Sequence, residues 1–250
     1  MKTKNITYIV LAGVVLLAVY ALTQPYSETP SREPATPNIP TPQTPEEKDS
    51  FGNEQIEKTI TDYLVQEKQL SWKTRADTHS FCTIENLKPE KELFPLYVWA
   101  VCGEYVIDNG ELVNISGSSG PVKIDYPNEL SFYDPNRFSH ESPGDGSDYT
   151  NDVKELFPPD VQEKIFAHEV EGIIERAETH ARKNIEDWNK IKEAATTCEI
   201  ESVMQTHNLD VTAVLKDGRT ITAKEPAIDD IFDAIQQHTD TCEEVIMATE

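Results

Sequence analysis

The sequence predicts an α+β protein preceded by a membrane helix and a proline-rich linker. Strand-like patterns, rich in β-branched and aromatic residues, fill residues 80–133 and resume at Cys198. Apolar residues recur every three or four positions, as in a helix, in residues 54–69 and 160–195. Strands that are grouped in runs, rather than alternating one by one with helices, are typical of α+β folds.

The N-terminus carries a hydrophobic run, Ile6–Leu22, that contains no charged residue. About 17 to 25 apolar residues in a helix can span the hydrocarbon core of a bilayer. Lys2 and Lys4 precede the run, and positive charge is retained on the cytoplasmic side of a membrane. We therefore expect residues 1–23 to form a single-pass transmembrane signal anchor, with the C-terminal bulk of the chain extracytoplasmic.

A cleaved signal peptide is the alternative interpretation of this run. Val19 and Ala21 have the spacing of residues that precede a cleavage site, which would lie after Ala21. Cleavage there would give a secreted protein instead of a tethered one. Both interpretations export the remaining residues.

A proline-rich tract follows the run. Seven of the 16 prolines lie in residues 24–50, with Ser, Thr and Glu in most of the gaps. Such a composition cannot bury a core and favours extended polyproline II conformations. We expect residues 24–50 to be a disordered spacer.

The balance of charge limits the partners of this chain. It holds 22 Lys and Arg against 45 Asp and Glu, a formal net charge of −23. This charge repels phosphate backbones, so we expect no nucleic-acid partner. The acidity serves solubility or, alternatively, the binding of a cation or a cationic partner. The expected partners are the membrane, through the N-terminal helix, and a protein of the cell envelope.

The chain has four cysteines, none of them in a CxxC motif. An even number of cysteines in an exported chain is typical of disulfides formed in an oxidising compartment. We predict the bonds Cys82–Cys102 and Cys198–Cys242, because each pair lies within one predicted unit. Four cysteines allow three connectivities, and four free thiols are the strongest rival.

The first predicted unit, residues 51–159, combines one helix with an antiparallel sheet. Asn53 is a plausible N-cap for the helix over 54–69. Gly103 suggests a bulge in the strongest strand, and Asp108-Asn109-Gly110 has the composition of a hairpin turn. The predicted strands are 80–87, 96–107, 111–116, 122–126 and 130–133.

The strongest strand carries three aromatic residues on one alternating face, namely Tyr97, Trp99 and Tyr105. Aromatic side chains in this pattern pack against the core of a sheet or, alternatively, form an exposed binding surface. We keep both interpretations at this point.

Part of this unit resembles a known class of domain. A G-S-x-x-G-P-V break is followed by P-x-D-G-S-x-Y-x-x-D and L-F-P segments. Residues 54–166 are thereby similar to small exported bacterial domains of the cystatin-like or nuclear-transport-factor-like kind. The resemblance implies an α+β fold and an exported location but no reaction. The matching residues are Gly117, Ser118, Gly120, Pro121, Val122, Pro143, Asp145, Gly146, Ser147, Tyr149, Asp152, Leu156, Phe157 and Pro158.

The remaining residues are predicted to form a long helix and a second small unit. Apolar residues at helical spacing predict one helix over 160–196, which connects the two units and has a weak point at Gly172, where it could loosen or break. Residues 197–250 read as two or three strands, a helix that begins at Pro226 and a closing strand over 245–249. We expect this ββ(β)αβ unit to fold on its own.

No motif in the sequence specifies a reaction. There is no G-x-S-x-G, no S-x-x-K and no glycine-rich phosphate loop, and the six histidines are scattered. We therefore predict no catalytic residue, no metal site and no cofactor. Two functions remain, a non-catalytic binding or interaction module on a stalk and, alternatively, an envelope hydrolase whose site assembles only in three dimensions. Two or more perturbed acids or histidines in a deep pocket would favour the hydrolase.

Overall fold

A computed structural model of the chain describes residues 45–89, 94–127 and 134–250. The predicted membrane helix (residues 1–23), most of the linker (24–50) and the predicted strand 130–133 lie outside these ranges. The elements are α2 (Pro45–Gln66), β1 (His79–Asn86), β2 (Leu96–Asp108), β3 (Glu111–Asp125), η1 (Pro135–Arg137), β4 (Ser139–Glu141), α3 (Tyr149–Leu156), α4 (Pro159–Phe166), α5 (Glu171–Thr196), β5 (Ile200–Gln205), β6 (Asp210–Leu215), β7 (Thr220–Lys224), α6 (Asp230–Gln236) and β8 (Ile246–Thr249). These helices and two sheets confirm the α+β prediction.

The first helix, α2, begins earlier than the sequence predicted. It starts at Pro45, so residues 45–50 of the expected linker are helical. The Glu-Glu-Lys sequence at 46–48 explains this start, because Glu and Lys are strong helix formers and acids are favourable near a helix N-terminus. The helix ends at Gln66, where a turn closed by the bond from Leu70 N to Glu67 O begins.

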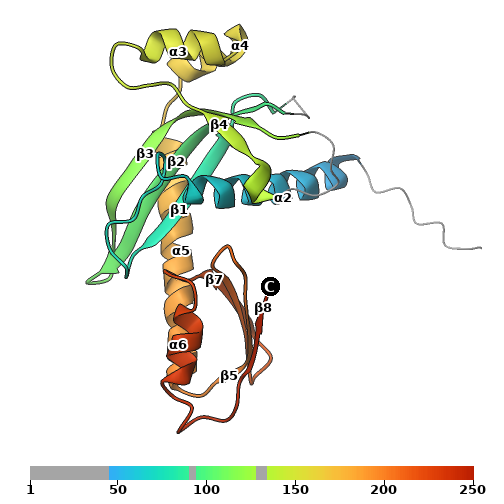
Figure 1. Cartoon of the computed structure of the whole chain (residues 1–250), viewed down its shortest axis with the longest axis vertical. Helices are drawn as coiled ribbons and strands as arrows, with labels where there is room; N and C mark the ends of the chain where they lie inside the picture. The colour runs from blue at the N-terminus through green and yellow to red at the C-terminus, as the bar shows by residue number, and fades with distance from the viewer. Residues whose placement is uncertain (1–44, 90–93, 128–133) are drawn as a thin grey trace, which may run out of the picture. The chain divides into compact units, whose positions relative to one another are not determined.

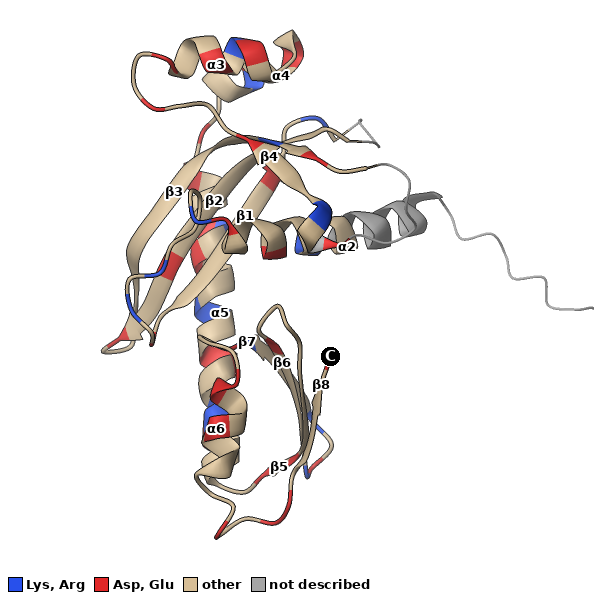
Figure 2. Ribbon diagram, in the orientation of Figure 1, with Lys and Arg blue, Asp and Glu red and all other residues tan. Residues whose placement is uncertain are grey.

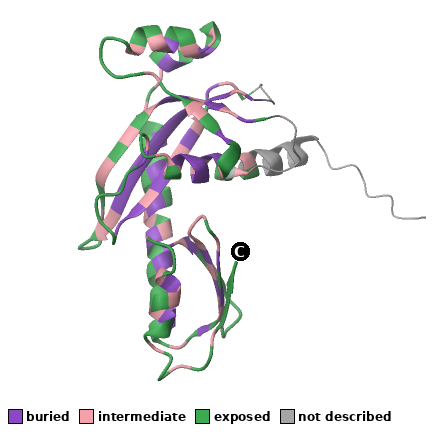
Figure 3. Ribbon diagram, in the orientation of Figure 1, coloured by how far each residue is buried: buried purple, intermediate pink, exposed green. Residues whose placement is uncertain are grey.

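The first sheet has the strand order β1-β2-β3-β4 and is antiparallel throughout. Its central strand β2 is buried on both faces, as its nearly continuous apolar sequence requires (Figure 3). One face packs against Ile60, Tyr63 and Leu64 of α2. The opposite face packs against α3, α4 and α5, so the sheet lies between two helical layers (Figure 1).

The β2–β3 hairpin corrects two details of the prediction. β3 is one continuous strand, where a break had been expected at residues 117–121. Gly117 faces Gly103 in register, and a Cβ on Gly117 would lie 2.5 Å from Cys102 O, so the glycines allow close approach and not a break. The register shift lies between Glu104 and Tyr105 rather than at Gly103. The turn itself has positive φ at Asn109 and Gly110, as predicted.

The predicted helix over 160–196 is two helices. α4 ends at Phe166, and α5 begins at Glu171 after an intervening segment. Both helices pack on the core of the first sheet, α4 through Val161 and Ile165 and α5 through Ile173. Only α5 continues to the core of the second sheet.

The second sheet has the strand order β7-β6-β5-β8. β5, β6 and β7 form an antiparallel meander, and α6 then carries the chain across so that β8 pairs in parallel with β5. This order of elements agrees with the predicted ββ(β)αβ arrangement. Ile231 and Ile235 of α6 are buried against one face of the sheet.

Helix α5 belongs to the cores of both sheets. Its first half contributes Ile173 and Ala177 to the core of the first sheet. Its second half contributes Trp188, Ile191 and Ala194 to the core of the second sheet. Residues Glu46–Glu250 group as one compact unit by their contacts, and the division into units at 51–159 and 197–250 stays a prediction. A helix that fills two cores is not a spacer between them.

Both predicted disulfides are confirmed. Cys82 and Cys102 are direct partners in the β1–β2 register, and Cys198 is bonded to Cys242. No cysteine of the chain is free. Two structural disulfides are typical of an oxidising, extracytoplasmic compartment. Within the described ranges, no helix combines the length and the apolar character that crossing a membrane requires.

The double role of α5 predicts how fragments of the chain behave. A fragment of residues 183–250 keeps Trp188 and Ile191 and should give dispersed amide resonances under oxidising conditions. A fragment of residues 195–250 lacks both side chains and should give collapsed spectra, because loss of a buried Trp alone typically costs about 3–5 kcal/mol. Dispersed spectra from the shorter fragment would show that α5 is dispensable for the second core.

Candidate functional site

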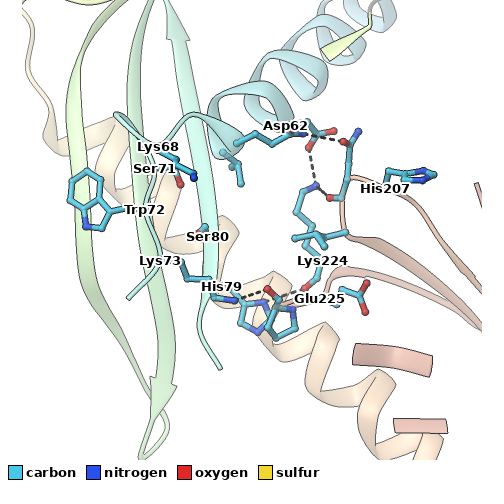
Figure 4. A pocket seen from close by; sticks show the side chains of 15 residues that line it. Asp62, Lys68, Ser71, Trp72, Lys73, His79, Ser80, His207, Lys224 and Glu225 are labelled. Carbon is cyan, nitrogen blue, oxygen red and sulfur yellow. Dashed lines mark hydrogen bonds and ion pairs between the residues drawn. The ribbon is translucent and has the colours of Figure 1, made fainter. Parts of the chain in front are cut away.

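A cleft of about 580 Å³ lies between α2 with its following loop and one end of the second sheet (Figure 4). The first sheet contributes the start of β1, and the second contributes the β5–β6 turn and the end of β7. The cleft is lined by Asp62, Val65, Gln66, Lys68, Ser71, Trp72, Lys73, His79, Ser80, His207, Asn208, Leu209, Lys224, Glu225 and Pro226. Segments far apart in the sequence therefore meet at this place.

Four charged residues form an ion-pair ring beside the cleft, namely Lys58, Asp62, Asp210 and Lys224, of which Asp62 and Lys224 line it. Lys58 Nζ lies 2.7 Å from Asp62 Oδ2 and 2.6 Å from Asp210 Oδ2. Lys224 Nζ lies 2.8 Å from Asp62 Oδ1 and 3.1 Å from Asp210 Oδ1. Each lysine thus bridges both aspartates, and the ring joins α2 to the second sheet.

The ring holds its charges in a partly buried setting. Burial opposes ionisation of Asp210, but the charge of Lys224 and the hydrogen bond and charge of Lys58 lower its pKa. Burial likewise opposes the charge on Lys58, while the hydrogen bonds to Asp210 and Asp62 raise its pKa. The net direction in both cases favours the charged form, so Lys58 and Asp210 are ionised at neutral pH.

A buried carboxylate, Glu104, fixes the loop beside the cleft. It is 1% exposed and accepts hydrogen bonds from Thr74 N, Arg75 N, Thr78 Oγ1 and Ser116 Oγ. Burial alone would raise the pKa of Glu104, but these hydrogen bonds lower it to about 2. The carboxylate therefore ties residues 74–78 to the first sheet.

Two further ionisable residues of the cleft have displaced pKa values. Burial lowers the pKa of His79 to about 4, and the charge of Lys73 acts in the same direction. Burial raises the pKa of Glu225. Both groups have protein partners, since His79 Nδ1 lies 3.2 Å from Lys224 O and Glu225 accepts from Gln205 Nε2 and from Ile231 N.

The rim of the cleft includes a strained backbone position. Leu209, in the β5–β6 turn, has φ of 66°, which is unfavourable for a residue with a branched side chain. Hydrogen bonds hold it there, from Leu209 N to Thr206 O at 3.1 Å and from Glu225 N to Leu209 O at 2.9 Å. Non-glycine residues in this region cluster at binding sites and cost about 1–3 kcal/mol.

The three aromatic residues singled out in the sequence lie elsewhere. Tyr97, Trp99 and Tyr105 share the face of β2 that α3, α4 and α5 cover, and all three are buried. Trp99 stacks on His168 with ring centroids 4.1 Å apart. The structure thus shows these rings as core residues, and their alternative role as an exposed binding surface does not apply to this arrangement.

The residues of the cleft were not found by sequence reasoning. One signal was present for Glu104, a lone carboxylate within the apolar strand β2, where an unpaired charge would be costly. No local pattern marks Asp62, Asp210 or Lys224, because their association depends on contacts between distant segments. Among the described residues, no three His, Cys, Asp or Glu side chains gather as metal ligands.

Comparisons with family models, with curated proteins and with solved structures found no match to this chain. The similarity of residues 54–166 to cystatin-like or nuclear-transport-factor-like domains therefore stays a prediction.

Substitution of Glu104 by Gln should lower the free energy of unfolding by about 3 kcal/mol at pH 7, because Gln cannot accept all of the donors around it. The folded-state pKa of about 2 lies below the usual 4.5, so the wild-type advantage is complete above pH 4.5 and is lost as the pH falls towards 2. Urea denaturation across this pH range measures the difference. The exposed control Glu155→Gln should change little, and a pH-independent difference for Glu104→Gln would contradict the assignment.

The ion-pair ring should show strong coupling in a double-mutant cycle. We expect Asp62→Asn combined with Lys224→Met to give an interaction energy of about 1–3 kcal/mol, because the Asp62 side chain is 4% exposed. The exposed pair Arg75–Asp77, changed to Gln and Asn, should give about 0–1 kcal/mol. Equal values for the two cycles would mean that the ring does not hold α2 to the second sheet.

Proposed function

We propose that this chain is a non-catalytic, extracytoplasmic binding protein whose ligand site is the cleft. The observation that carries the proposal is a cavity of about 580 Å³ that combines apolar side chains with convergent polar groups. Sites for small molecules have volumes of about 300–1,000 Å³ and this mixed lining. The N-terminal anchor and the proline-rich linker would hold the binding unit at a distance from the membrane.

The rigidity of the cleft supports this proposal. Glu104 fixes the loop on one side, and the ion-pair ring fixes α2 against the second sheet. The Cys82–Cys102 bond braces the sheet on which α2 packs. A site whose walls are already fixed loses less conformational entropy when a ligand binds.

A hydrolase is the second candidate, and the displaced pKa values of His79 and Glu225 favour it. However, the carboxylate of Glu225 is engaged by Gln205 and Ile231 N, and His79 Nδ1 is engaged by Lys224 O. Neither residue is paired with a serine, threonine or cysteine nucleophile by any described hydrogen bond. Burial is the largest cause of both pKa shifts, and both side chains are engaged by protein partners, so we favour binding over catalysis.

A thermal-shift screen of the purified full chain tests the proposal, with neutral sugars, amino acids, carboxylic acids and phosphate esters as probes. A compound present at 100 times its Kd should stabilise by about 2.7 kcal/mol, which raises Tm by about 5–10 °C. Asn208→Trp, which fills the cleft, should abolish the shift. Thr220→Trp on the exposed part of β7 is the matched control and should preserve it.

Two results would contradict the proposal. The first is the absence of any stabilising compound in the panel. The second is an undiminished shift in the Asn208→Trp protein, which would place the ligand outside the cleft.

A further inference from the structure

The charge within the cleft differs from that of the chain as a whole. Acids exceed bases by 45 to 22, and acidic positions are spread along the helices and strands of the described ribbon (Figure 2). Lysines outside the cleft that form ion pairs are Lys58, Lys88, Lys123, Lys183, Lys190 and Lys216. Among the described residues, neither Lys68 nor Lys73 has a carboxylate within ion-pair distance. Both line the cleft.

The carboxylates that line the cleft are already engaged. Asp62 is shared between Lys58 and Lys224. Glu225 directs its carboxylate to Gln205 and to the backbone of Ile231, and its pKa is raised by burial. Neither acid is paired with Lys68 or Lys73, so the lining has three lysines, with Lys224, against two acids that are engaged elsewhere.

Lys73 is held in position by the protein. Its Nζ donates to Ala76 O at 3.0 Å and to Pro226 O at 2.6 Å. An ammonium group has three donors, so one N–H remains for a ligand. Burial lowers the pKa of Lys73, and the charges of Asp230, Glu104 and Asp77 only partly offset this effect. An anion bound beside it would compensate for that desolvation.

A hydroxyl group also lines the cleft. Ser71 is 7% exposed, and Figure 4 shows it beside Lys68, whereas the side chain of Lys73 extends towards Pro226. Among the described residues, the Ser71 hydroxyl has no hydrogen-bond partner. Two ammonium groups and a hydroxyl donor that line one cleft can supply the hydrogen bonds that an oxyanion accepts.

We infer that the cleft binds a small molecule through a carboxylate or phosphate group, whose oxygens are held by Lys68, Lys73 and Ser71. The inference rests on the proposed binding function and names the class of ligand. The rest of the molecule lies against Val65, Leu209 and Pro226, the apolar part of the lining. The volume of about 580 Å³ suits a small molecule rather than a folded partner.

Matched pairs of probes test this inference by calorimetric titration of the full chain. Glycerol 3-phosphate is compared with glycerol, and glutarate with glutaramide, so each pair differs in the anionic groups. The anionic member of at least one pair should bind more tightly by about tenfold or more, and its binding should weaken as salt is added. The pair that shows the difference distinguishes a phosphate from a carboxylate ligand.

Lysine substitutions locate the anion. Lys68→Gln removes a charge that has no described partner, so it should leave the fold intact and weaken anion binding by about tenfold. Lys73→Gln should do the same, and Lys154→Gln, an exposed lysine on α3, is the matched control. Unchanged anion binding in both cleft variants, or equal weakening in the control, would overturn the inference.

The outcomes separate this inference from the function on which it rests. If neutral and anionic members bind equally and Asn208→Trp abolishes both, the cleft is a binding site but not for an oxyanion. If no member of either pair binds in a manner that depends on Asn208, Lys68 or Lys73, the inference is overturned, and the wider screen then decides the proposed function.

Discussion

The structure depends on the burial of one helix, α5, in two hydrophobic cores. Its apolar stripe runs from Ile173 to Ala195, and successive segments of the stripe face the first and then the second sheet. A helix is rigid over this length, so packing at each end fixes the two sheets relative to each other. The cleft exists because the sheets are held at a distance that side chains from α2 and the β5–β6 turn only partly fill.

Polar interactions around the cleft stabilise the arrangement of α2, the loop at residues 74–78 and the second sheet that hydrophobic packing produces. The ion-pair ring cannot form unless α5 has brought Asp62 and Asp210 within reach of the same lysines. Its members lose hydration on burial, and each contacts two opposite charges, which offsets part of that cost. Glu104 acts similarly for the adjoining loop, since five donor groups of Thr74, Arg75, Thr78 and Ser116 replace its hydration. These two interactions give the cleft fixed walls.

The positions of the residues with displaced pKa values bear on the choice between binding and catalysis. An active site needs a displaced pKa together with an available polar atom directed at a substrate. In this cleft, the strongly displaced groups His79 and Glu225 are occupied by internal partners, whereas the groups that remain available include Lys68, Lys73, the Ser71 hydroxyl and the imidazole of His207. Such groups hold an anion well, but none is paired with a base or nucleophile. The chemistry of the available atoms therefore favours recognition.

The sequence alone determined the features that depend on local patterns. Alternating strands, hairpin turns and helical stripes gave the α+β class, the approximate position of most strands and the order of the last unit. Cysteines that were close in the predicted topology gave both disulfides.

Tertiary structure decided the remaining features. Contacts between apolar faces decided where α4 and α5 separate and that α5 contributes to two cores. They also buried Tyr97, Trp99 and Tyr105. The cleft brings together residues that are about 160 positions apart, such as Asp62 and Lys224. The spacing of apolar residues indicates which face of a helix or strand is apolar. It does not indicate which element covers that face, because the covering residues lie far away in the sequence.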